Sequence, residues 1–281
     1  MKTVELPDGK QVPALGQGTW RMGENSKLHA DEVAALRLGI DLGMTLIDTA
    51  EMYGEGGSEK VVADAIEGQR ERVFVVTKVY PHNASRTELP KACERSLKRL
   101  RIDAIDLYLL HWRSVSLAET VEAFEQLRSA GKIRRWGVSN FDVEDIKELV
   151  GLDRRASRGE SCVANQVLYN LENREIESGL LPWSERNKIP IMAYSPVGHG
   201  RGLLNNLTLN EIAKRKDATA AQVALAWVLR QPGVIAIAKA SDQDHVRQNA
   251  RSVEIELTKK DLAEIDRAFP PPKSKEPLPM L

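Results

Sequence analysis

Short runs of apolar and β-branched residues alternate along the chain with longer stretches in which apolar residues recur at helical spacing. The short runs predict strands near residues 14–18, 44–48, 73–77, 105–110, 133–138, 162–166, 190–194 and 234–238. The longer stretches predict helices near residues 30–43, 57–69, 86–100, 117–130, 142–150, 175–188, 208–230 and 242–249. Strands that alternate with helices in this way favour an α/β protein with the parallel (β/α)8 architecture of a TIM barrel.

The two ends of the chain depart from this alternation. Asp8-Gly9 predicts the turn of an N-terminal β-hairpin. Residues 269–281 contain five prolines, which exclude a regular helix there. This proline-rich segment either frays, as chain ends often do, or packs back onto the protein. We expect residues 1–281 to form a single barrel domain, because barrels of this kind reach this length.

A doubly wound parallel sheet is the alternative architecture for the same order of elements. Such a sheet would be expected to carry a glycine fingerprint directly after its first strand. The corresponding segment here, Gly16-Gln17-Gly18-Thr19-Trp20-Arg21, lacks the third glycine. The barrel is therefore the favoured fold.

Composition narrows the class of protein. Forty basic and forty acidic residues cancel, so the overall charge does not indicate nucleic acid or an anionic membrane as a partner. Cys93 and Cys162 are too few for a disulfide framework and lack metal-ligand spacing. The first nine residues lack the apolar stretch of a signal peptide, and no apolar run approaches the roughly 18 residues of a membrane span. We expect a cytoplasmic protein with no metal site.

Four polar residues stand at or just beyond the ends of predicted strands: Asp48, Tyr53, Lys78 and His111. Each alone has a structural explanation, as a cap, a loop aromatic, a strand terminus or a core histidine. In a parallel barrel, however, the carboxyl ends of all strands converge on one face, where active sites lie. A carboxylate, a phenol, an ammonium and an imidazole gathered there could donate a proton to a substrate.

The segments around these residues resemble the motifs of a known family. Asp48-Thr49-Ala50-Glu51-Met52-Tyr53-Gly54, followed by Gly57-Ser58-Glu59, resembles the first signature of the aldo-keto reductases. Residues 96–112 resemble the second signature, residues 131–141 the fifth-strand motif, and residues 193–198 the seventh-strand motif. The matches follow the family order from about residue 12 to residue 250.

The resemblance implies the reduction of an aldehyde or ketone to an alcohol. Side chains cannot supply hydride, so a nicotinamide cofactor is implied. Tyr53 would donate the proton, and the Lys78 ammonium would lower the phenol pKa from its ordinary value of about 10. Asp48 would keep Lys78 charged and oriented, and His111 would orient the carbonyl. Bacterial relatives suggest a small reactive carbonyl such as methylglyoxal as the substrate, and a monomer.

The resemblance also implies which residues hold the cofactor. Around the nicotinamide and its ribose they are Gly18, Thr19, Trp20, Asp48, Ser139, Asn140, Gln166 and Tyr194. A glycine-rich loop over residues 195–202 could present backbone N–H groups to the pyrophosphate; its expected contacts are Ser195, Val197 and Gly198. The adenosine end would meet Lys239, Ser241, His245 and Asn249, and the substrate would meet Trp20, His111 and Trp112.

The adenosine site departs from one common family pattern. His245 stands where many relatives carry arginine, and Ala238 and Ala240 flank Lys239 in place of proline and serine. Lys239 remains a suitable partner for a 2′-phosphate. NADPH is therefore the expected cofactor, with NADH as a weaker alternative.

Other functions fit the motifs less well. A glycoside hydrolase needs two carboxylates, whereas the fourth and seventh strands are followed by His111 and Ser195. Gly137-Val138-Ser139-Asn140-Phe141 lacks the closing glycine of a nucleophile elbow, and no HExxH or paired CxxC motif indicates a metal. The remaining alternative is a dinucleotide-binding regulatory subunit with little turnover.

Overall fold

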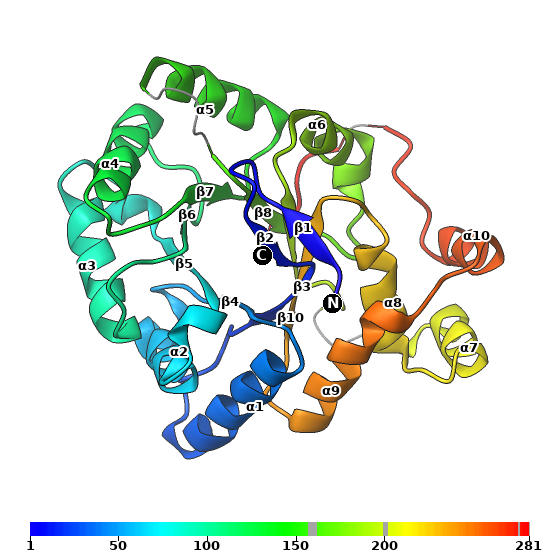
Figure 1. The fold of residues 1–281 in the computed structure, drawn as a ribbon. Helices are drawn as coiled ribbons and strands as arrows, with labels where there is room; N and C mark the ends of the chain where they lie inside the picture. The colour runs from blue at the N-terminus through cyan, green and yellow to red at the C-terminus, as the bar shows by residue number, and fades with distance from the viewer. Residues whose placement is uncertain (157–161, 199–201, 275, 281) are drawn as a thin grey trace.

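Eight parallel strands close into a barrel in the computed structural model, which describes residues 1–156, 162–198, 202–274 and 276–280 (Figure 1). Around the barrel the order is β10-β3-β4-β5-β6-β7-β8-β9. The bounds are β3 (Leu15–Gly18), β4 (Leu46–Asp48), β5 (Phe74–Val79), β6 (Leu107–Leu110), β7 (Trp136–Ser139), β8 (Asn165–Leu168), β9 (Ile191–Tyr194) and β10 (Val234–Lys239). The predicted (β/α)8 barrel is confirmed, and every predicted strand overlaps an observed one.

The barrel strands are buried along nearly their whole length because both of their faces are covered. All six residues of β5 are buried, including Thr77 and Lys78. Parallel strands enclosed by helices outside and by packed side chains inside require such continuous burial. A lysine within such a strand is therefore exceptional and needs a partner for its charge.

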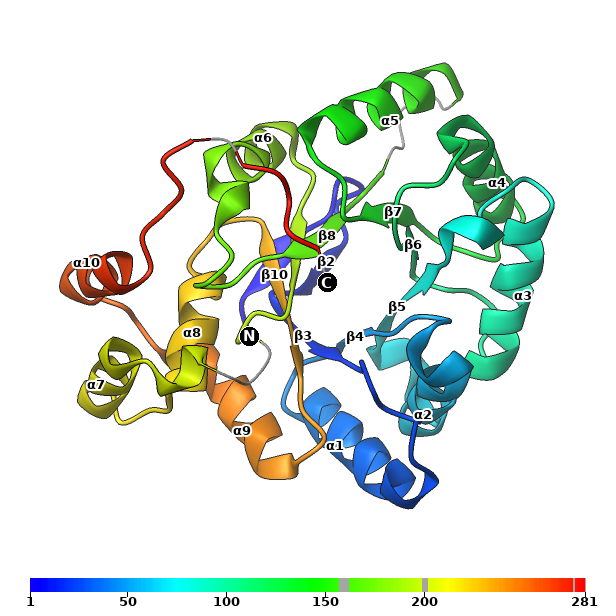
Figure 2. The same cartoon turned by 180° about the vertical axis from the view of Figure 1, so that it is seen from behind.

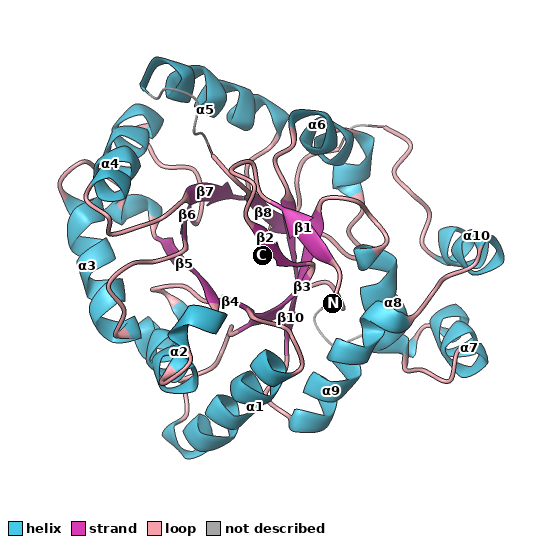
Figure 3. Ribbon diagram, in the orientation of Figure 1, coloured by secondary structure: helices cyan, strands magenta, loops and turns pink. Residues whose placement is uncertain are grey.

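A ring of helices surrounds the strands (Figure 3). It consists of α1 (His29–Asp41), α2 (Gly57–Ile66), α3 (Glu88–Leu100), α4 (Leu117–Ser129), α5 (Val143–Ala156), α6 (Leu180–Asn187), α8 (Ala220–Leu229) and α9 (Gln243–Arg251). Two more helices, α7 (Leu207–Arg215) and α10 (Lys259–Ala268), pack against each other outside α8. Among the described residues, no helix is both long enough and apolar enough to cross a membrane.

The prediction of one helix over residues 208–230 was wrong. The chain forms α7 and α8 instead, because Asp217 adopts a positive φ of 49° and Thr219 begins a new helix with a capping box to Gln222. The sequence reading also missed α10, which begins with a second capping box between Thr258 and Asp261. Near residues 175–188, a 3-10 turn (Glu175–Ser178) precedes α6.

The two chain ends lie at opposite ends of the barrel. The predicted hairpin is confirmed as β1 (Thr3–Glu5) and β2 (Gln11–Pro13), and it covers the amino-terminal ends of the strands (Figure 1). After α10 the chain returns across the opposite face (Figure 2), and Leu278 packs against the core. Arg174 holds the start of this segment by donating to the Phe269 carbonyl oxygen at 2.5 Å.

Candidate functional site

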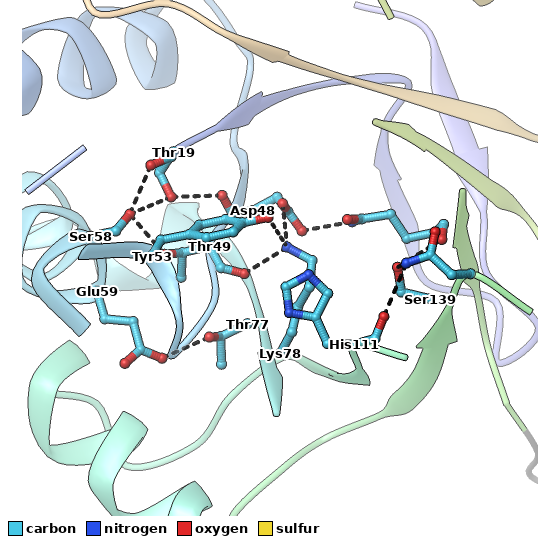
Figure 4. Close-up of polar contacts among 12 residues, drawn as sticks. Thr19, Asp48, Thr49, Tyr53, Ser58, Glu59, Thr77, Lys78, His111 and Ser139 are labelled. Carbon is cyan, nitrogen blue, oxygen red and sulfur yellow. Dashed lines mark hydrogen bonds and ion pairs between the residues drawn. The ribbon is translucent and has the colours of Figure 1, made fainter. Parts of the chain in front are cut away.

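Lys78 is the centre of a polar cluster at the carboxyl ends of β4, β5 and β6. Its ammonium donates to Asp48 Oδ2 at 2.7 Å, to the Thr49 carbonyl oxygen at 2.9 Å and to the Tyr53 hydroxyl at 3.2 Å (Figure 4). Asp48 is the last residue of β4, and Tyr53 opens the 3-10 turn η2 (Tyr53–Gly56) that leads into α2. The structure thus brings the predicted carboxylate, phenol and ammonium into direct contact.

Asp48 has a second partner that the sequence did not indicate. Gln166 in β8 donates to Asp48 Oδ1 at 2.8 Å, while Lys78 occupies Oδ2. The two residues are 118 positions apart in the chain. Both carboxylate oxygens are therefore fixed by charge-assisted or buried hydrogen bonds, which hold the group in one orientation.

The Lys78–Asp48 ion pair is almost completely withdrawn from solvent. The Lys78 side chain is 0% exposed and the Asp48 side chain 4%. Burial disfavours the charged lysine, but the nearby Asp48 and Tyr53 outweigh burial, so the pKa of Lys78 lies above its ordinary value. The ammonium is consequently charged at neutral pH.

Lys78 lowers the pKa of Tyr53, as expected, but the net shift of the Tyr53 pKa is upward, which the sequence did not predict. Burial raises the pKa of Tyr53, and the Asp48 carboxylate raises it further. The Lys78 ammonium lowers it, but by less than the other effects combined. The Tyr53 hydroxyl therefore keeps its proton at neutral pH, as a proton donor must.

His111 follows β6 and completes the cluster. Its ring lies edge-on to Tyr53, with 6.0 Å between ring centroids. Burial, aided by the Lys78 charge, lowers the pKa of His111 to about 2. The imidazole is therefore neutral at physiological pH, and it can act as a hydrogen-bond donor through one ring nitrogen only.

Four of the predicted nicotinamide residues meet beside this cluster, at the ends of β7, β8 and β9. Ser139 Oγ donates to the Gln166 carbonyl oxygen at 2.9 Å, and the Asn140 backbone N–H donates to the same oxygen at 2.8 Å. Asn140 adopts a positive φ of 63°. The Tyr194 hydroxyl, from the end of β9, donates to Asn140 Oδ1 at 3.0 Å. Amide and hydroxyl groups from three neighbouring strands are thus gathered at one point.

The residues at the end of β3 divide into buried and exposed members. Gly18 pairs with Asp48 on one side and with Lys239 on the other. Thr19 is fully buried; its hydroxyl donates to the Asp48 carbonyl oxygen at 3.0 Å, and its own carbonyl oxygen accepts from the Ser58 hydroxyl at 3.0 Å. Trp20 is 46% exposed, which leaves a large apolar ring at the rim of the site.

The predicted adenosine residues lie at the end of β10 and in α9. Lys239 is exposed, and its ammonium donates to Ser241 Oγ at 2.9 Å. The first turn of α9 is capped by Asp242, which accepts from the His245 backbone N–H at 3.1 Å, while the His245 side chain is exposed. Asn249 is half-buried further along the same helix. Lys239, Ser241 and His245 are thus accessible at one helix terminus.

The glycine-rich loop is only partly within the described part of the chain. Ser195, Val197 and Gly198 are half-buried after β9, and Ser195 adopts a positive φ of 49°. Asn170 donates to the Ser195 carbonyl oxygen at 2.9 Å and so fixes the beginning of the loop. Residues 199–201 lie outside the described residues, and with them part of the predicted pyrophosphate contact.

Trp112 stacks on His111, with 3.9 Å between ring centroids and 13° between the ring planes. Arg113, the next residue, points to α5. It donates to Asp145 at 2.9 Å and to Glu148 at 2.8 Å. The segment after β6 is thereby fastened to α5, and this ion-paired arginine is held at the surface.

Two further side chains beside the cluster were not assigned a role from the sequence. Glu59 lay within a recognised motif, and it is completely buried against Thr77 and Arg99. Ser58 lies 2.7 Å from Thr19 Oγ1 and 3.1 Å from Thr49 Oγ1. A carboxylate in the first turn of a helix is usually exposed, so no local signal in the sequence showed that Glu59 is buried.

Within the described ranges, no group of three or more His, Cys, Asp or Glu side chains is placed to hold a metal ion.

Comparison with known proteins places this site in a family. Residues 14–269 match the model of the aldo/keto reductase family. The methylglyoxal reductase YeaE of Escherichia coli (strain K12) is 52% identical, over 100% of this chain and 99% of that protein. Two crystal structures of a Klebsiella pneumoniae aldo/keto reductase, one with NADP and acetate and one with NADPH, are each 50% identical. Each match covers 100% of this chain and 99% of the Klebsiella chain, and the TM-scores are 0.95 and 0.94. This chain belongs to the aldo/keto reductase family.

Proposed function

We propose that this protein is an NADPH-dependent reductase of small aldehydes and ketones, with Tyr53 as the proton donor. The observation that carries the proposal is the contact of the Lys78 ammonium with both Asp48 and the Tyr53 hydroxyl. A protonated phenol next to a buried cation is suited to stabilise and then protonate an alkoxide that forms on a carbonyl.

Each charge in the cluster has a distinct effect on that proton transfer. Burial keeps Tyr53 protonated in the free protein. As the phenol gives up its proton, Lys78 stabilises the phenolate at a distance of 3.2 Å. Asp48 balances the lysine charge and fixes its direction. His111, neutral and next to Tyr53, would donate to the carbonyl oxygen and orient it.

The donor set beside the cluster fits a nicotinamide dinucleotide. When bound, NADPH would supply the hydride. Ser139, Asn140 and Gln166 offer amide and hydroxyl groups for a carboxamide, and the Tyr194 ring lies next to Asn140. Lys239, Ser241 and the exposed His245 offer a cation, a hydroxyl and an imidazole to a phosphate. The NADP and NADPH complexes of the Klebsiella relative support this choice of cofactor.

The proposed substrate is methylglyoxal or another small, reactive carbonyl compound. The support is the 52% identity to a methylglyoxal reductase over the full length of both chains. Trp20 and Trp112 would border the reacting group, since Trp20 is exposed at the rim and Trp112 stacks on His111. We also propose a cytoplasmic monomer, which analytical ultracentrifugation and cell fractionation would test.

A turnover assay separates the enzyme from the regulatory alternative. NADPH oxidation followed at 340 nm should be rapid with methylglyoxal and slow without it. A dinucleotide-binding regulatory subunit would bind NADPH but show little turnover with any member of a panel of aldehydes and ketones. Repeating the panel with NADH measures the cofactor preference in the same experiment.

We expect Lys239→Met to weaken NADPH binding selectively. Loss of a charged hydrogen bond to the 2′-phosphate should raise the Kd for NADPH about tenfold or more, which corresponds to about 1.5–3 kcal/mol. The Kd for NADH should barely change, because NADH has no phosphate at that position. His245→Arg should tighten NADPH selectively, since a guanidinium stays charged and grips phosphate with paired donors.

Fluorescence titration of the wild type and both variants with each cofactor measures these changes. The comparison between cofactors is the decisive quantity, because a general folding defect would weaken both. Equal losses of NADPH and NADH affinity in Lys239→Met would show that the phosphate binds elsewhere.

A further inference from the structure

Glu59 is a fully buried carboxylate that has no part in the chemistry described above. It is the third residue of α2, and its side chain is 0% exposed. Glu59 Oε1 accepts from the Thr77 hydroxyl at 2.7 Å, and Oε2 accepts from Arg99 Nε at 2.5 Å (Figure 4 shows the Thr77 contact). A buried charge with two such partners is a fixed point in the structure, because moving it would leave the charge unpaired.

These partners belong to the elements that flank the proton donor. Thr77 directly precedes Lys78 in β5, and Arg99 comes from α3. Glu59 itself directly follows Ser58, which contacts Thr19 and Thr49 at the ends of β3 and β4. The start of α2 is therefore tied to β3, β4, β5 and α3 through two consecutive side chains.

The turn that carries Tyr53 and the first residue of α2 are held between α3 and the loop that follows β3. Gly56 has a φ of 84°, and a Cβ atom there would lie 2.5 Å from Arg99 Cδ. On the other side, a Cβ atom on Gly57 would lie 2.6 Å from the Gly23 carbonyl oxygen. Only glycine fits such close approaches. The Arg99 side chain that pairs with Glu59 thus packs directly against the Tyr53 turn.

We propose that Glu59 is a positioning residue that sets the distance between the Tyr53 hydroxyl and the Lys78 ammonium. It links α2, which continues the Tyr53 turn, to the residue next to Lys78. The inference rests on the proposed reductase function. The charged groups that shift the pKa of Tyr53 are Lys78 and Asp48, and Glu59 is not among them. Glu59 therefore acts on Tyr53 through geometry and not through its charge.

Glu59→Gln tests this role with a minimal change of shape. The amide oxygen can still accept from Thr77, but the amide nitrogen faces Arg99 as a second donor. We expect kcat for methylglyoxal to fall about tenfold or more, since small displacements at a reacting centre have effects of this size. The Kd for NADPH, measured by fluorescence, should stay within about twofold of the wild type, because Glu59 lies outside the proposed cofactor site.

The pH profile distinguishes positioning from a general loss of structure. If the Tyr53–Lys78 distance increases, the ammonium stabilises the phenolate less, and the Tyr53 pKa rises. Turnover that depends on a protonated Tyr53 is present below that pKa and is lost above it. The alkaline limb of kcat should therefore move to higher pH in Glu59→Gln. A purely structural defect would lower kcat at all pH values without moving this limb.

Asp106→Asn is a matched control, because Asp106 directly precedes β6 and contacts the amino-terminal part of β5, away from Lys78. Asp106 is a buried carboxylate that accepts from Arg70 at 2.6 Å and from the Val75 backbone N–H at 2.9 Å. This substitution should lower the thermal unfolding temperature as Glu59→Gln does, while kcat and the pH profile stay as in the wild type. The double variant Glu59→Gln/Arg99→Gln, which restores complementary amide hydrogen bonding, should recover part of kcat.

The outcomes separate the inference from the function on which it rests. Wild-type protein that binds NADPH but does not reduce any carbonyl compound would refute the proposed function. An active wild type with unchanged kcat in Glu59→Gln, or with losses equal to those of Asp106→Asn and no shift of the alkaline limb, would overturn the role of Glu59 alone.

Discussion

Tyr53→Phe is expected to abolish most turnover while NADPH binding stays nearly intact. The substitution removes the only group in the cluster that is both protonated at neutral pH and held 3.2 Å from the Lys78 ammonium. Loss of a donor that acts on developing negative charge should lower kcat about 10²-fold or more. Affinity for NADPH should barely change, because the proposed carboxamide partners are Ser139, Asn140 and Gln166.

Stopped-flow turnover and fluorescence titration of NADPH measure the two quantities separately. Tyr108→Phe is the matched control, since Tyr108 is also a buried tyrosine but packs edge-on against Phe124 of α4, with 5.8 Å between ring centroids. Removal of the Tyr108 hydroxyl should leave kcat at the wild-type level. A wild-type kcat in Tyr53→Phe would remove Tyr53 from the role of proton donor.

Lys78→Met is expected to reduce both turnover and stability. Without the ammonium, Tyr53 loses the charge that stabilises its phenolate, and kcat should fall about 10²-fold or more. The buried Asp48 carboxylate would also lose its ion-pair partner, which typically lowers the free energy of unfolding by about 3–5 kcal/mol. The double variant Asp48→Asn/Lys78→Met should recover stability, because no unpaired charge remains, but it should not recover kcat.

The pH profiles of the two single variants should move in opposite directions. Lys78 lowers the Tyr53 pKa and Asp48 raises it. Turnover requires protonated Tyr53, so it is present below this pKa and is lost as the pH rises through it. The alkaline limb should therefore move to higher pH in Lys78→Met and to lower pH in Asp48→Asn. Asp48→Asn should have the milder effect on kcat, because the cation remains. An unchanged rate and profile in Lys78→Met would leave the lysine with a structural role only.

Most of the fold could be predicted because the barrel strands coincide with short runs of mainly apolar residues in the sequence. The residues of β5, for example, form a continuous apolar run interrupted only by Thr77 and Lys78. The break between α7 and α8 was missed because helix-forming residues continue on both sides of it. Only the backbone at Asp217, with its positive φ, and the cap at Thr219 separate the two helices. Local propensity does not distinguish one long helix from two when the break depends on packing.

The identity of the four clustered residues was also readable from the sequence. Asp48, Tyr53, Lys78 and His111 stand at or just after the ends of strands, and parallel strands in a barrel end on one face. Their order and spacing further resembled a known family, and the match over residues 14–269 confirms that membership. Strand-end position and motif order are both properties of the linear sequence.

Only the tertiary structure decided the charges and contacts within the cluster. Burial raises the Tyr53 pKa although a lysine lies next to it, and burial keeps His111 neutral. The Gln166–Asp48 hydrogen bond and the Thr77–Glu59–Arg99 contacts join residues that are far apart in the chain. Desolvation and the distance between charges depend on how all elements pack around a group. The sequence by itself therefore determined which chemical groups meet at this face of the barrel, while packing alone determined their protonation and their geometry.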